Sequence, residues 1–359
     1  SKRFDGVNTE FTNMMRDAPD ITNVVEACNV DDRLENLERM LGLLEMCEKA
    51  LQDYLETKRI AFPRFYFVAP ADLLDILSKG TNPQLILRHL SKCFDNIHNL
   101  SFEPDEMGNP SKNAISMWSG EKENVAFAGK CMCEGPVEQW LNVVVETMRA
   151  ALFHEFKLSV PKYDQMPRTK WMFEQSAQNT ITVSRLIFTQ EVNEAFDRLE
   201  DGDDNAMKDL LQKQLDQLKG IIEAVNGKLE KLDRKKVLTL CTIDVHARDT
   251  CQKLIDEKVD VADAFQWSSQ LRYGTNEKTG KLQINVCDAE IPYMYEYIGS
   301  PGCLVITPLT DRCVITLTQA QRLVLGGAPA GPAGTGKSWL AVAMAVRALK
   351  AGQVDRIVL

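Results

Sequence analysis

Residues 331–338, with the sequence Gly-Pro-Ala-Gly-Thr-Gly-Lys-Ser, match the P-loop pattern G-x-x-x-x-G-K-[ST] at every fixed position. The glycines let the backbone turn with positive φ and bring its N–H groups close to a phosphate chain. Lys337 can reach the β- and γ-phosphates, and the Ser338 hydroxyl can bind Mg²⁺. A following helix would direct its positive N-terminal end at the anion. The pattern predicts a nucleotide site, the alternative being a glycine-rich loop that binds nothing.

The residues around the P-loop fit the opening of an α/β nucleotide domain. The short apolar run 323–325 precedes it, an alanine-rich helical pattern follows, and residues 354–359 resemble a second strand. No later hydrophobic strand ends in Asp-Glu, so the acid that would hold Mg²⁺ and polarise water is absent, as are sensor residues and an arginine finger. We expect this chain alone to bind a nucleotide weakly at most and to turn none over efficiently.

Length and charge limit how many domains this chain can contain and which kinds of partner it can bind. A chain of 359 residues favours two or three domains. The net charge of −9, from 51 acidic and 42 basic residues, argues against nucleic acid as the main partner. Since no apolar run approaches 18 residues, no membrane partner is expected. The chain begins with Ser1 and has no signal-peptide pattern, so we expect a fragment.

The ten cysteines are scattered, and only Cys131 and Cys133 lie close together. A C-x-C pair with no second pair or nearby histidine is weak evidence for a metal. We expect reduced thiols that behave as small apolar residues.

Two leucine series predict long helices. The first lies in residues 31–58 and repeats at three- and four-residue steps for about three heptads, which favours a bundle core over a coiled coil. The second predicts one helical seam that runs through residue 232. A third helix is expected from Pro136 onwards. The second seam consists of Leu211, Leu215, Leu218, Ile222, Val225, Leu229 and Leu232.

Other stretches show β-like or chemical patterns. Residues 62–68 are aromatic and indicate a buried strand or a tight connection, and a β-hairpin is expected around the polar turn 119–124. Residues 266–297 are again β-like and rich in tyrosine. Residues 238–249 hold two acids, a histidine and an arginine, for which local hydrogen bonding is favoured over a metal or acid–base site.

The breaker cluster 299–302 is the best domain boundary. The predicted fold is therefore a mainly α helical-bundle body of about 300 residues with a small β-hairpin, followed by the truncated start of an α/β P-loop domain.

Several long strings resemble the dynein heavy chain, in the order in which that family has them. They are residues 54–59, 62–67, 72–77, 241–249 and 304–312. The resemblance covers about residues 1–338, and the wording of 54–77 is most similar to axonemal heavy chains of the outer-arm beta type. Residues 339–359 resemble PhoH-like P-loop ATPases instead, where dyneins usually continue with Thr-Glu-Thr and a lysine-rich helix.

The resemblance implies a division of the chain and a nucleotide site. Residues 1–299 would be the C-terminal part of an elongated helical linker, and residues 300–359 the start of the first AAA+ module. Lys337 and Ser338 would be the catalytic residues of this chain, with ATP and Mg²⁺ as cofactors and Ser338 as the metal ligand. The residues implied to bind the nucleotide are Val305, Ile306, Pro308, Leu309, Gly331, Gly334, Thr335, Gly336, Lys337 and Ser338.

The resemblance also implies a microtubule motor. ATP binding and hydrolysis would bend and straighten the linker and so move the motor along microtubules in a cilium or flagellum. The implied partners are the rest of the motor ring, other dynein heavy, intermediate and light chains, and microtubules through parts outside this chain. The implied location is cytoplasmic, in the cytoskeleton of the axoneme.

Two alternatives stay open from the sequence. One is a PhoH-like or helicase-like NTPase with a helical N-terminal domain, which rests on about 20 residues and is disfavoured by the negative charge. The other is a non-catalytic helical interaction segment whose P-loop is vestigial.

Overall fold

The structure, a computed structural model, describes residues 2–17, 21, 23–300, 302, 303 and 305–328. The backbone forms two compact units. The first comprises residues 1–93 and 133–143, and the second comprises residues 94–132 and 144–359. Within the described residues, no helix has both the length and the apolar content that a bilayer span requires.

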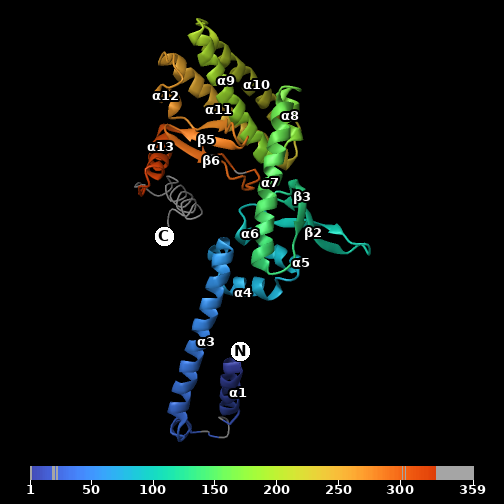
Figure 1. The fold of residues 1–359 in the computed structure, drawn as a ribbon, viewed down its shortest axis with the longest axis vertical. Helices are drawn as coiled ribbons and strands as arrows, with labels where there is room; N and C mark the ends of the chain where they lie inside the picture. The colour runs from blue at the N-terminus through green and yellow to red at the C-terminus, as the bar shows by residue number, and fades with distance from the viewer. Residues whose placement is uncertain (1, 18–20, 22, 301, 304, 329–359) are drawn as a thin grey trace. The chain divides into compact units, whose positions relative to one another are not determined.

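The first unit contains the helix that the first leucine series predicts. Helix α3 covers Arg33–Ala61, which confirms this prediction, and α1 packs against it (Figure 1). The bundle core favoured for this leucine series is wrong for the described residues, because only Met40 and Leu55 of α3 are buried and Leu34 is 70% exposed. The described elements of this unit before α7 are α1 (Lys2–Asp17), α2 (Val24–Cys28), α3, η2 (Pro63–Phe67), α4 (Pro70–Lys79), α5 (Pro83–Ile86), η3 (Leu87–His89) and α6 (Leu90–Cys93).

The aromatic stretch 62–68 is a tight connection, the second of its two predicted structures. Pro63–Phe67 form a 3₁₀ turn, and no strand forms there. Pro63 occupies the first helical position, where its fixed φ suits a turn. The 3₁₀ period of three places Phe62 and Phe65 on the same side, and both rings are buried 4.9 Å apart in an edge-on contact. Burial of this ring pair outweighs the β preference of the individual residues.

In the second unit, β1 (Asn99–Pro104), β2 (Pro110–Trp118) and β3 (Asn124–Met132) form an antiparallel sheet in the order β1-β2-β3. The predicted hairpin is present as β2 and β3, where buried Met117 pairs with buried Val125. Its turn is closed by the Ser119 N–H, which donates to the Glu123 carbonyl at 2.9 Å. Strand β1 extends this hairpin into a three-stranded sheet.

Helices α9 (Ala177–Glu200), α10 (Ala206–Asn226) and α11 (Lys231–Asp256) lie side by side in the second unit (Figure 1). The predicted seam through residue 232 is wrong in two respects. Helix α10 ends at Asn226, because Gly227 is a poor helix former and adopts an extended conformation. The predicted and buried rows also share Leu218 alone, and Leu215 and Ile222 of the predicted row are exposed. The buried row of α10 is Ala206, Met207, Leu210, Gln214, Leu218 and Ile221.

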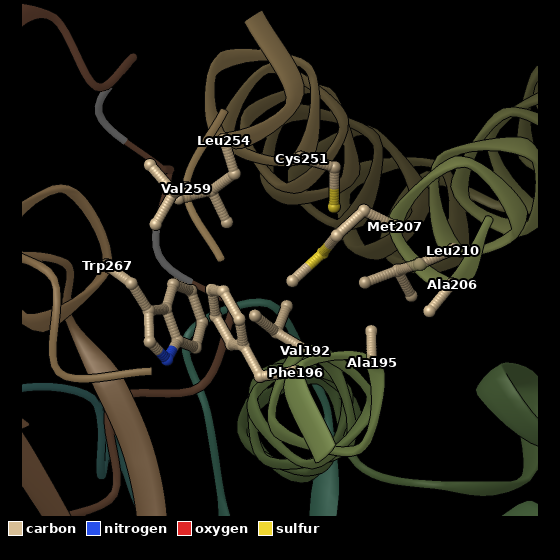
Figure 2. Packing of buried hydrophobic residues seen from close by; sticks show 10 residues of the cluster. All are labelled: Val192, Ala195, Phe196, Ala206, Met207, Leu210, Cys251, Leu254, Val259 and Trp267. Atoms are coloured by element: carbon tan, nitrogen blue, oxygen red, sulfur yellow. The ribbon is translucent and has the colours of Figure 1, made fainter. Parts of the chain in front are cut away.

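These three helices enclose an apolar core that Trp267 completes. Figure 2 shows the Trp267 ring next to Phe196. Trp267 lies on the short helix α12 (Phe265–Ser268), is buried, and donates from Nε1 to the Asn193 Oδ1 atom at 3.1 Å. It therefore ties the segment after α11 to helix α9. The cluster consists of Val192, Ala195, Phe196, Ala206, Met207, Leu210, Cys251, Leu254, Val259 and Trp267.

The tyrosine-rich stretch forms a second antiparallel sheet, as its β-like pattern predicts. Strands β4 (Arg272–Thr275), β5 (Leu282–Val286) and β6 (Ala289–Pro292) pair in that order. The Tyr273 N–H donates to the Thr189 hydroxyl at 3.0 Å, which docks β4 on α9. The remaining described helices are α7 (Val137–Tyr163), which continues from the first unit into the second, α8 (Arg168–Glu174) and α13 (Pro308–Arg322).

The acidic residue at the centre of the 238–249 stretch takes part in a buried ion pair. Arg168 donates two hydrogen bonds to the Asp244 carboxylate, at 2.5 and 2.8 Å. The two side chains are 12% and 4% exposed. Burial opposes the charge of Arg168, but the adjacent Asp244 raises the pKa of its guanidinium above the usual value. Arg248 donates to the carboxylate of its neighbour Asp249 at 2.9 Å. The favoured local hydrogen bonding is therefore confirmed for Asp249, whereas Asp244 bonds a residue 76 positions away.

We predict that Asp244→Ala destabilises the second unit by about 3–5 kcal/mol, because it leaves a buried arginine without its carboxylate. Urea unfolding followed by circular dichroism measures this effect. The double variant Asp244→Leu/Arg168→Met, which removes both charges, should recover most of the loss. An Asp244→Ala chain as stable as the wild type would contradict a structural role for the pair.

We also predict that Trp267→Ala costs about 3–5 kcal/mol of unfolding free energy, because it removes a large buried ring from the core in Figure 2. Phe265→Ala is the matched control, since Phe265 lies on the same short helix and is 65% exposed. The control should change stability by no more than about 0.5 kcal/mol. Equal losses in the two variants would mean that the core does not depend on Trp267.

Candidate functional site

Residues 305–309 are the part of the predicted nucleotide site that the structure describes. Thr307 caps helix α13, because its hydroxyl accepts the Thr310 N–H at 3.3 Å and Pro308 occupies the first helical position. This cap leaves Val305, Pro308 and Leu309 exposed, with Val305 at 67% and Leu309 at 59%. Exposed apolar side chains of this kind offer a surface on which a flat ring such as adenine can lie.

Ile306 differs from its neighbours because it is half-buried. It lines a cavity of about 40 Å³ together with Arg168, Arg185, Asp244 and His246. A cavity of this size has room for ordered water and not for a nucleotide. The described part of the predicted site therefore has one residue that faces the helical body, while the other three face outward.

The P-loop residues Gly331, Gly334, Thr335, Gly336, Lys337 and Ser338 lie outside the described residues. Of the predicted site residues, the structure therefore describes Val305, Ile306, Pro308 and Leu309, which are close in the sequence.

The acid–base alternative for residues 238–249 gains no support from this cavity. His246 is half-buried, and this burial lowers the pKa of its imidazole. Among the described residues, no group of three or more metal-ligating side chains is close enough to hold an ion. The ten cysteines, all within the described part, form no disulfide. Burial raises the pKa of Cys93 and of Cys251 to about 12, which agrees with apolar thiols.

Three tyrosines hold the segment that leads to residues 305–309. The Tyr297 hydroxyl donates to the Glu123 carboxylate at 2.8 Å, and burial together with this carboxylate raises the pKa of Tyr297. The Tyr295 hydroxyl accepts the Leu282 N–H at 2.9 Å, and burial raises its pKa to about 12. The Tyr293 and Tyr295 rings meet edge-on at 5.0 Å. The sequence marks these residues as aromatic but gives no sign of their partners.

Arg185 of α9 is a further residue near the site that the sequence analysis missed. Its guanidinium lies 5.5 Å from the Tyr273 ring centre and donates to the Cys303 sulfur at 3.8 Å. Its Nε atom is buried without a hydrogen-bond partner in the described chain. Arg185 therefore reaches from the helical bundle to the chain just before Val305. Nothing in the local sequence distinguishes this arginine from an exposed one.

Two family models match different parts of the chain. Residues 1–159 match the model described as dynein heavy chain, N-terminal region 2. Residues 293–349 match the model described as the hydrolytic ATP binding site of the dynein motor region. We call residues 293–298 the tyrosine segment. The second match begins at its first residue, includes residues 305–309 and all of 331–338, and continues beyond Ser338.

Individual relatives agree with these matches. The dynein beta chain of the flagellar outer arm of Chlamydomonas reinhardtii is 66% identical over 338 residues, which is 94% of this chain and 7% of the relative. Dynein axonemal heavy chain 9 of Homo sapiens is 51% identical over 338 residues, covering 94% of this chain and 8% of the relative. The chain thus spans less than a tenth of the length of these relatives. It belongs to the dynein heavy chain family.

Proposed function

We propose that this chain is the junction between a lever and an ATPase module in a dynein motor. Residues 1–299 form the linker part, and residues 300–359 form the beginning of the first AAA+ module. The observation that carries this proposal is the ATP-site match, which starts at residue 293 where the chain leaves the second sheet. The long packed helices α9, α10 and α11 suit a lever, because packed helices resist compression and transmit displacement.

The nucleotide of this proposal is ATP, with Mg²⁺. The backbone N–H groups of Gly334, Thr335 and Gly336 bind phosphate oxygens, Lys337 neutralises the β- and γ-phosphates, and Ser338 ligates the metal ion. Val305, Pro308 and Leu309 contact the adenine ring. Their exposure in the structure supports this role, since apolar side chains that are free to contact a ligand gain from covering it. ATP contains the phosphoanhydride bond that hydrolysis at this site would cleave.

The proposal extends to the motor that carries such a junction. The relatives are named after flagellar outer arms, cilia and axonemes, so we place this chain in the axoneme of a cilium or flagellum. There, ATP binding and hydrolysis would shift the linker and drive movement along microtubules. The partners would be the rest of the motor ring and other dynein chains, with microtubules bound outside this chain.

We predict that Lys337→Ala weakens MgATP binding by this chain about 10- to 100-fold, because it removes a charged hydrogen bond to the phosphates. Isothermal titration calorimetry of the 359-residue chain measures the dissociation constant. Lys208→Ala is the control, since Lys208 is exposed on α10, and it should bind like the wild type. If Lys337→Ala and the wild type bind MgATP equally, the P-loop does not hold the nucleotide.

A further inference from the structure

The junction is held by the side-chain amide of Gln178, the second residue of α9. This amide is buried, with the whole residue 4% exposed. Its nitrogen donates to the Glu296 carbonyl at 2.6 Å and to the Tyr293 hydroxyl at 2.8 Å. Its oxygen accepts the Ile298 N–H at 2.8 Å. Gln178 therefore bonds the backbone of the tyrosine segment on both sides of residue 297.

A second amide, that of Asn96, holds the next backbone group. The Asn96 nitrogen donates to the Ile298 carbonyl at 3.1 Å and to the Glu121 carboxylate at 3.1 Å. Its oxygen accepts the Gly120 N–H at 3.1 Å. Asn96 thus connects the tyrosine segment to the turn of the first sheet. We call Gln178 and Asn96 together the amide clamp.

The chain changes direction immediately after the amide clamp. Gly299 has a φ of +60°, a backbone angle that residues other than glycine adopt only with strain. A Cβ atom at Gly299 would lie 2.0 Å from the Asn96 amide nitrogen. Glycine therefore suits both the positive φ of this turn and its close approach to Asn96.

The bonds of Gln178 copy those of a neighbouring parallel strand. In a parallel ladder, one residue donates to the carbonyl before its partner and accepts from the N–H after it. Gln178 does this with residues 296 and 298, so it fixes their register as a strand would. An apolar side chain of the same size would fill the same space but would leave the two backbone groups unpaired, which is costly when they are buried.

We propose that Gln178 and Asn96 are positioning residues for the nucleotide site. The amide clamp sets where and in which direction the chain leaves the helical bundle, and so where residues 305–309 lie. Even when fully extended, the chain from Ile298 to Val305 spans no more than about 25 Å. Helix α13, which follows residues 305–307, is also held, because its Gln319 donates to the Val286 carbonyl at 3.0 Å. The nucleotide part of this inference rests on the proposed function.

The experiment compares Gln178→Glu with Gln190→Glu in the full 359-residue chain. Glutamate keeps the size of glutamine but replaces the nitrogen donor with an oxygen, so the Glu296 carbonyl loses its partner. Gln190 is on the same helix and is exposed, which makes it the matched control. Hydrogen–deuterium exchange is measured for peptides from 296–309 and from 206–226, which is helix α10, and the dissociation constant for MgATP is measured by calorimetry.

We expect Gln178→Glu to raise exchange in peptides from 296–309 about tenfold, because it breaks or weakens hydrogen bonds that hold this segment. Exchange in 206–226 should stay unchanged, and the dissociation constant for MgATP should rise at least fivefold. Gln190→Glu should match the wild type in all three measurements. A purely structural role of Gln178 would raise exchange in both segments alike.

A second pair of variants tests the clamp without altering Gln178. Gly299→Ala should reproduce the local rise in exchange, because its methyl group displaces Asn96. Gly302→Ala is the control, since a Cβ atom at Gly302 meets nothing within 4 Å. This pair decides the question if Gln178→Glu fails to fold.

The outcomes separate the clamp from the proposed function. Unchanged exchange in 296–309, or an equal rise in both segments, would overturn the clamp. A local rise with unchanged MgATP affinity would overturn its role in positioning the nucleotide site. If the wild-type chain binds no MgATP, the proposed function fails, while a local rise in exchange would still support the clamp as the anchor of the junction.

Discussion

The second unit depends on one constraint: the backbone of the tyrosine segment must find hydrogen-bond partners outside the sheets. Residues 293–298 follow strand β6 and form no further strand. The Tyr293 N–H still donates to the Leu282 carbonyl of β5, Tyr295 has a φ of +52°, and the segment is partly buried among helices. Buried N–H and C=O groups that lack partners are costly, so the surrounding elements must supply polar atoms. This requirement explains why Gln178, Asn96 and Glu123 are polar although they are buried.

Glu123 shows how one buried group can serve several elements. Its carboxylate accepts the Ala177 N–H at 2.8 Å, at the start of α9, and the Tyr297 hydroxyl at 2.8 Å. A negative charge is favourable at a helix N-terminus, which carries a partial positive charge. Glu123 itself lies in the turn between β2 and β3. A single side chain therefore joins the first sheet, helix α9 and the tyrosine segment.

A periodic signal predicted that α3, α10 and the β2–β3 hairpin exist, although it misplaced the end and the buried face of α10. Contacts with no periodic signal were missed. The leucine series of α3 and the alternation of β2 and β3 each repeat over many residues. A single residue that breaks such a pattern therefore does not change which element is predicted. Gln178 and Asn96 belong to no repeat. Their partners at Glu296 and Ile298 are 118 and 202 residues away in the chain, and only the folded structure brings them together. The same holds for Arg168 and Asp244, which are 76 residues apart.

The kind of interaction at the junction matters for a lever. Apolar contacts have no preferred direction, so a segment held by them alone could slide along the helices at little cost. Hydrogen bonds weaken steeply when their angle or distance changes. The tyrosine rings contribute burial, whereas Gln178 and Asn96 fix the register. A junction that combines the two resists sliding as well as separation, which is the property that the proposed lever requires where the chain leaves the helical bundle.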